Sequence, residues 1–145
     1  DEKGADIVLE LLQHPDRSWR MVICGSGARA GDIKRSLNSF LGDVFIENAS
    51  NRQVADLMND CCVLINPHVE IGAMGGGVFP FKMIEYINTG AFVVSTDVGL
   101  PVSWCSDAAG ICIVRRSADA FFAAIVHRLA INRTECDDEV FRHTR

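Results

Sequence analysis

This sequence lacks the features that mark nucleic-acid-binding and membrane-spanning proteins. Its net charge is −5, and its 14 Lys and Arg residues are scattered along the chain. A phosphate backbone requires clustered cations, so we expect no nucleic-acid partner. No apolar run reaches the roughly 18 residues of a membrane helix, and no secretory signal peptide opens the chain. We therefore expect no transmembrane segment.

The six cysteines form no CxxC pair, and the histidine spacing matches no zinc site. Cys61 and Cys62 lie side by side in an apolar run, and free cysteine is among the most buried residue types. A domain of 145 residues buries enough apolar surface to fold without cross-links. We expect reduced, buried cysteines, no bound metal and a cytoplasmic location.

Short apolar runs alternate with amphipathic helical patterns along the chain. Strands are expected over 19–24, 44–47, 61–66, 91–96 and 110–114, and helices over 5–14, 32–41, 51–59, 81–89 and 118–132. This alternation predicts the α/β class, with a doubly wound (Rossmann-like), mostly parallel sheet and helices on both faces. We expect one domain over residues 1–132 and a polar C-terminal tail over residues 133–145.

Ligands of such sheets bind at the carboxyl ends of the strands, and the segment 68–90 has the most unusual chemistry there. The glycine run Gly75–Gly77 and Pro80 precede a predicted helix. Glycines let the backbone approach a ligand, and a helix start offers unpaired N–H groups and a positive dipole end. Lys82 adds a cation in the first turn, and Glu85 follows on the same face. The pattern predicts a diphosphate beside Lys82 and a ribose at Glu85.

Other nucleotide-binding motifs are incomplete. The Walker pattern GxxxxGK[ST] is absent, and the turn from Gly25 to Ala30 lacks the third glycine of GxGxxG. Glu47 only partly matches the acid that binds ribose in NAD-binding domains. These gaps disfavour a flavodoxin-like or NAD-binding domain. Gly25 and Gly27 serve either a ligand or only the tight turn after the strand.

Over nearly its whole length, the chain resembles the C-terminal, donor-binding domain of retaining GT-B glycosyltransferases of the group 1 (family four) type. The most specific block is FPFKMIEY at 79–86 followed by GAFVVST at 90–96, which resembles the family core "P.K..EY…G.pvv.t". Weaker likenesses, in chain order, are Lys3-Gly4, Val22–Gly27, Val44–Asn48 with Val54–Leu57, Leu64–Pro67, and Gly110 with Ile113–Val114.

The resemblance implies transfer of a sugar from a UDP-, GDP- or ADP-sugar to an acceptor, without a metal or other cofactor. It also implies that a first strand and an N-terminal, acceptor-binding domain lie upstream, so that this chain alone is not a complete enzyme and has no assigned catalytic residue. Together, the pattern and the resemblance predict the donor-binding residues Lys3, Gly25, Gly27, Asn48, Glu70, Gly75, Gly76, Gly77, Pro80, Lys82 and Glu85.

One departure from the family pattern motivates an alternative function. The family often has two glutamates spaced E-x7-E, but Gly77 stands at the first of these positions, and Glu70 lies fifteen residues before Glu85. The alternative is a glycosyltransferase-like binding or scaffolding module whose donor site is degenerate.

Overall fold

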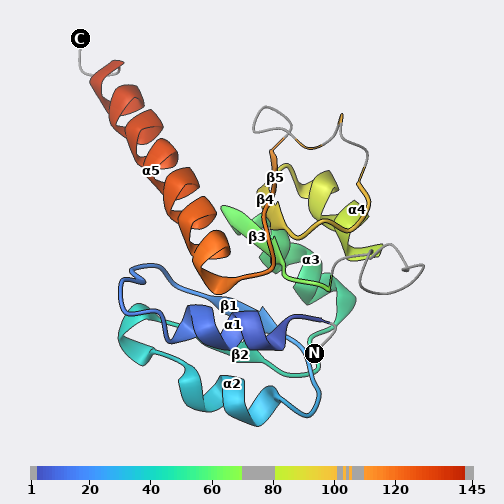
Figure 1. Ribbon diagram of the computed structural model, residues 1–145. Helices are drawn as coiled ribbons and strands as arrows, with labels where there is room; N and C mark the ends of the chain where they lie inside the picture. The colour runs from blue at the N-terminus through green and yellow to red at the C-terminus, as the bar shows by residue number, and fades with distance from the viewer. Residues whose placement is uncertain (1–2, 70–80, 101–102, 104, 106–109, 143–145) are drawn as a thin grey trace.

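Helices and strands alternate along the chain in the computed structural model (Figure 1). It describes residues 3–69, 81–100, 103, 105 and 110–142, with the side chains of the last helix described to residue 131. The elements are α1 (Ala5–Leu12), β1 (Val22–Cys24), α2 (Ala30–Ser36), the 3-10 helix η1 (Ser39–Leu41), β2 (Val44–Ile46), α3 (Asn51–Asn59), β3 (Val63–Asn66), α4 (Phe81–Thr89), β4 (Phe92–Ser95), β5 (Ile111–Ile113) and α5 (Ala118–Arg142).

All paired strands in the described residues run parallel. β1 pairs with β2, and β3, β4 and β5 form a second sheet in that order. The predicted α/β, Rossmann-like class is confirmed. In the described residues the strands form two separate ladders, because β1 is hydrogen-bonded to β2 alone. The two sheets nevertheless share a core, since Ile23 of β1 and Ile65 of β3 pack against the same apolar cluster.

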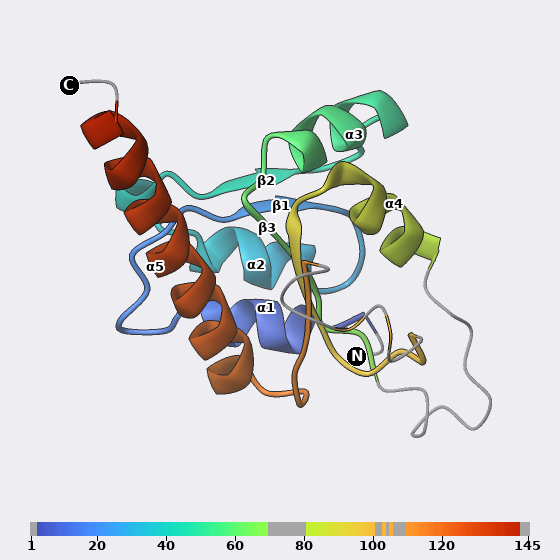
Figure 2. The ribbon, with the colours of Figure 1, turned by 90° about the horizontal axis from the view of Figure 1, so that it is seen from above.

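Alternating side chains of β4 separate two apolar clusters. Phe92 and Val94 belong to the cluster that contains α1 and α5, whereas Val93 belongs to the one that contains Met83 of α4. Neighbouring strand residues point to opposite faces, so helices cover both faces of this sheet. Figure 2 shows this arrangement, with α1 and α5 on one side of β4 and α3 and α4 on the other. The continuous apolar sequence of β4 follows from this double burial.

The predicted helix over 32–41 is divided in the structure. α2 ends at Ser36, Leu37 is extended, and η1 follows. The cause is Asn38, whose side-chain oxygen accepts hydrogen bonds from the N–H groups of Phe40 and Leu41 and so starts a new helical turn. Gly42 ends this turn in the left-handed conformation (φ 76°).

The last helix is longer than predicted, because α5 continues to Arg142 rather than ending at Asn132. No Gly or Pro interrupts the sequence from Ala118 to Arg142, and polar residues alone do not end a helix. In Figure 1 the C-terminal part of α5 extends away from the rest of the molecule.

The expectation of buried cysteines holds only in part. Cys24 and Cys61 are partly buried, but Cys62 is exposed, and none of the three forms a disulfide. Cys62 lies directly before β3, outside the strand.

Candidate functional site

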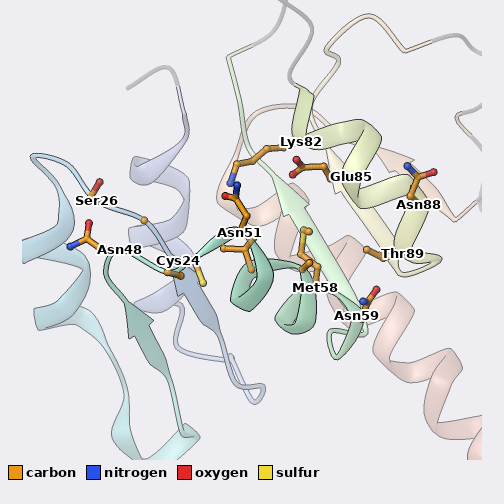
Figure 3. A pocket seen from close by; sticks show the side chains of 14 residues that line it. Cys24, Ser26, Asn48, Asn51, Met58, Asn59, Lys82, Glu85, Asn88 and Thr89 are labelled. Atoms are coloured by element: carbon orange, nitrogen blue, oxygen red, sulfur yellow. The ribbon is translucent and has the colours of Figure 1, made fainter.

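A pocket of about 630 Å³ lies between the ends of β1 and β2 on one side and helices α3 and α4 on the other (Figure 3). The described residues that line it are Cys24 at the end of β1, Gly25 and Ser26 after β1, Asn48 and Ala49 after β2, Asn51, Val54, Ala55, Met58 and Asn59 of α3, and Lys82, Glu85, Asn88 and Thr89 of α4. A pocket at the carboxyl ends of parallel strands is where this class of fold places its ligands.

Among the described residues that line the pocket, the charged side chains, Lys82 and Glu85, both belong to α4. Met83 between them is fully buried and anchors α4 in the core, which leaves Lys82 and Glu85 exposed on the pocket side. Neither one forms an ion pair or a side-chain hydrogen bond with another described residue. The helix therefore presents a cation and a carboxylate that the described part of the chain does not neutralise.

Tyr86 follows Glu85 on the inner side of α4. Burial raises the pKa of its phenol, and the neighbouring Glu85 carboxylate raises it further. The phenol therefore stays protonated and uncharged at neutral pH. It packs against the cluster that contains Met83, so its role is to hold α4 against the sheet.

The opposite wall begins at the turn after β2. Asn48 has φ 56°, the only positive φ of a non-glycine residue in the described ranges. Asn tolerates this left-handed conformation better than most residues. A capping box then fixes the start of α3: the Gln53 N–H donates to Ser50 Oγ (3.3 Å), and the Ser50 N–H donates to Gln53 Oε1 (2.9 Å). The cap thus fixes the start of α3, which carries Asn51, directly after the turn that contains Asn48.

The two glycines after β1 differ in their surroundings. The Gly25 N–H donates to the Ile46 carbonyl (3.1 Å), so this residue extends the β1–β2 ladder at the pocket edge. Gly27 has φ 136°, which L side chains rarely adopt, and it does not line the pocket. The turn conformation is therefore a sufficient reason for glycine at position 27.

Lys3 lies outside the pocket, beside the carboxyl end of β3. The reason is Gly4, which has φ 80° and is packed so closely that a Cβ atom would lie 2.3 Å from the Pro67 carbonyl oxygen. Lys3 is exposed at this position.

The pocket brings together four of the residues predicted to bind the donor, Gly25, Asn48, Lys82 and Glu85. It does not include Lys3 or Gly27. The remaining predicted residues lie outside the described ranges: Glu70, Gly75, Gly76, Gly77 and Pro80. Sequence reasoning missed the α3 wall, above all Asn51 and Met58, because no local motif marks it. The only available signal was that α3 starts directly after a strand end.

Glu47 does not take the place of a ribose-binding acid at the end of β2. Its Oε2 lies 2.6 Å from Nζ of Lys34, and Glu47 does not line the pocket. This ion pair, together with the incomplete GxGxxG motif, argues against an NAD-binding domain.

Two kinds of feature are absent from the part of the chain that the structure describes. No group of three or more His, Cys, Asp or Glu residues there is arranged to hold a metal ion. None of the helices in that part of the chain is long and apolar enough to cross a membrane.

The chain matches a family model over most of its length. The family model described as glycosyl transferases group 1 matches residues 1–130 of the 145. A search of curated proteins finds no match. The matched region contains every residue that lines the pocket, on both of its walls. Because the family model covers most of the sequence, this chain belongs to the glycosyl transferases group 1 family.

Proposed function

We propose that this chain binds the nucleotide-sugar donor of a glycosyltransferase and is the C-terminal half of a retaining, two-domain GT-B enzyme. The observation that carries the proposal is the pair Lys82 and Glu85, which line a pocket of about 630 Å³ and have no charged partner among the described residues. The retaining outcome and the second domain come from the family resemblance.

The diphosphate of the donor lies beside Lys82 in this proposal. Lys82 is in the first turn of α4, where the helix dipole is positive and backbone N–H groups lack partners within the helix. An ammonium group at this end is unfavourable unless an anion is also present. A diphosphate is the anion that a nucleotide sugar supplies, and it receives charge-assisted hydrogen bonds from Lys82.

The ribose lies beside Glu85. Three residues along a helix correspond to about 4.5 Å of rise, so Glu85 stands roughly one turn beyond Lys82 on the pocket wall. A carboxylate accepts hydrogen bonds only and can take one from each of two neighbouring hydroxyl groups. The 2′- and 3′-hydroxyls of a ribose present this pair.

Sugar transfer breaks the bond between the anomeric carbon and the diphosphate, and negative charge develops on the leaving diphosphate. Lys82 and the start of α4 stabilise that charge without reorganising, which lowers the barrier. The acceptor and its binding site belong to the proposed N-terminal domain. We therefore propose that this chain alone binds the donor but transfers sugar poorly.

Calorimetric titration of the chain with UDP, GDP and ADP tests this function. At least one nucleoside diphosphate should bind, and Glu85→Ala should weaken it by about ten- to a hundredfold, the loss of hydrogen bonds to a charged group. The matching 2′-deoxynucleotide separates the ribose role from a general charge effect. It should bind the native chain more weakly than the ribonucleotide, and the difference should disappear in Glu85→Ala.

Glu10→Ala is the matched control, because Glu10 is an exposed helical glutamate that does not line this pocket. It should leave nucleotide binding unchanged. Unchanged binding in Glu85→Ala would remove the ribose role. If the folded chain binds none of the three diphosphates, the scaffolding alternative is favoured instead.

A further inference from the structure

Helices α3 and α4 form two facing walls of the pocket. Their lining residues recur every three or four positions, so each helix presents one face to the pocket. The C-terminal ends of the two helices lie side by side, because they lead into β3 and β4, whose first residues are paired. Both helices are nine residues long. Their first turns, which carry Asn51 and Lys82, therefore lie together at the other end of the pocket.

Asn51 and Lys82 converge at this end without bonding to each other. Figure 3 shows the two side chains pointing toward one another from α3 and α4, whereas Asn48 lies apart from them, beside Ser26. Asn51 and Lys82 are both exposed, and neither has a side-chain hydrogen bond or ion pair with another described residue. The hydrogen-bonding groups of both side chains are therefore open to a ligand.

The two side chains can act on one ligand in the same way. The ammonium group of Lys82 only donates hydrogen bonds, and an asparagine amide donates through its NH₂ group. A ligand that lies between them and accepts from both sides uses the two groups together, and the Lys82 charge favours an anion. A diphosphate meets both conditions, because its two phosphoryl groups carry terminal oxygens that can face opposite walls.

We propose that Asn51 is a second diphosphate-binding residue, which holds the diphosphate of the donor from the α3 wall while Lys82 holds it from the α4 wall. This inference rests on the proposed function, which places the diphosphate beside Lys82. The Ser50–Gln53 capping box fixes the backbone of the first turn of α3, so Asn51 is in place before the ligand binds. The site then recognises the diphosphate itself, independently of the ribose and the base.

Calorimetry with inorganic pyrophosphate tests this role, because that ion contains the diphosphate without a ribose or a base. The native chain should bind pyrophosphate as well as at least one of UDP, GDP and ADP. Asn51→Ala and Lys82→Ala should each weaken both kinds of ligand about tenfold or more, through the loss of a hydrogen bond to a charged group. Glu85→Ala should weaken the nucleoside diphosphate without weakening pyrophosphate, which has no ribose.

Asn51→Asp replaces the amide by a carboxylate of similar size. An acidic residue suits the first turn of a helix, so this variant should fold normally. It should weaken pyrophosphate more than Asn51→Ala does, because the new carboxylate repels the anion and neutralises Lys82. Gln13→Ala is the control, since Gln13 has an exposed amide group and does not line this pocket. It should leave both affinities unchanged.

Three results would overturn the role of Asn51 and leave the proposed function in place, provided that Glu85→Ala still weakens the nucleoside diphosphate. The first is that Asn51→Ala weakens the nucleoside diphosphate but not pyrophosphate, which would move Asn51 to the ribose or the base. The second is that Asn51→Ala and Asn51→Asp leave both ligands unchanged. The third is that the native chain binds a nucleoside diphosphate but no pyrophosphate. If the folded native chain binds none of these ligands, both proposals fail together.

Discussion

At the scale of single residues, Gly4 shows how a close backbone contact fixes an amino acid. Its φ of 80° disfavours any side chain, and an added Cβ would lie 2.3 Å from the Pro67 carbonyl oxygen. The Pro67 carbonyl oxygen belongs to the backbone, so it cannot move aside as the end of a flexible side chain would. This contact joins the start of α1 to the carboxyl end of β3.

Gly4→Ala should therefore lower the free energy of unfolding by about 2 kcal/mol, from left-handed strain and the clash with Pro67. Urea denaturation measures the change. Gly31→Ala is the control, because it lies in α2 with an ordinary φ, and its Cβ would meet only the flexible end of Arg35 at 3.4 Å. That variant should be neutral or slightly stabilising. Equal losses in the two variants would contradict this account of Gly4.

Arg17 and Asp43, which precede β1 and β2 respectively, form a buried ion pair. The carboxylate accepts from both terminal nitrogens of Arg17, at 2.8 and 2.6 Å, and the side chains are 1% and 0% exposed. Asp43 also accepts from the backbone N–H groups of Met21 (2.9 Å) and Asn38 (2.8 Å). The pair thus ties the entry of β1 to the entry of β2.

Arg17→Ala should cost about 3–5 kcal/mol of unfolding free energy, because it leaves a buried carboxylate without its counter-ion. Chemical denaturation checks this value. Lys34→Ala, which breaks the exposed pair with Glu47, should cost no more than about 1 kcal/mol. A similar cost for both substitutions would show that burial of the Arg17 pair does not matter to stability.

Stability should also fall in acid. Burial alone would raise the pKa of Asp43, but hydrogen bonds from Arg17, Asn38 and Met21 outweigh it and hold the pKa below its ordinary value. Hydrogen bonding to Arg116 lowers the pKa of Asp6 against burial in the same way. A lowered native pKa stabilises the fold fully above the unfolded value of about 3.9, and this contribution is lost as the pH falls through the native pKa. Thermal melts from pH 6 to pH 2 should show a drop that Asp43→Asn makes shallower.

At the scale of elements, local capping signals decided which helix bounds the sequence could predict. α3 and α4 run over the predicted residues, because Asn48–Ser50 offers a cap before one and Gly90 follows the other. α2 and α5 were predicted wrongly. An N-cap at Asn38 divides the predicted helix over 32–41, and the polar residues after position 132 do not end α5. Capping residues and glycines can be recognised locally in the sequence. No local residue indicates that a helix continues beyond its expected end.

A substitution that removes the N-cap of α3 tests whether this cap also supports nucleotide binding in the pocket. Ser50→Ala should lower stability by about 1 kcal/mol and should also weaken nucleotide binding, because the turn that carries Asn48 and Asn51 loses its anchor. Ser117→Ala is the matched control, since Ser117 Oγ accepts from the Ala120 N–H at the start of α5 and Ser117 does not line the pocket. It should cost similar stability but leave nucleotide affinity unchanged. Thermal melts and calorimetry on both variants measure the two effects.

At the scale of the whole molecule, the sequence predicted one wall of the site better than the other. Lys82 and Glu85 share one helix, so their spacing was enough to associate them. Cys24, Asn51 and Met58 reach the same pocket only because β1, α3 and α4 pack together, and no spacing along the chain encodes that contact. The fold class followed from the alternation of strands and helices, but the division into two sheets did not.

The measurement that tests the central claim most directly is mapping of backbone amide shifts by NMR while UDP, ADP or GDP is titrated into the chain. The account predicts that the shifts concentrate at the turn after β2 and at the start of α4, around Asn48–Asn51 and Lys82–Glu85. Shifts confined to the groove between α1 and α2, which Glu10 and Arg35 line, would contradict it and move the nucleotide site elsewhere.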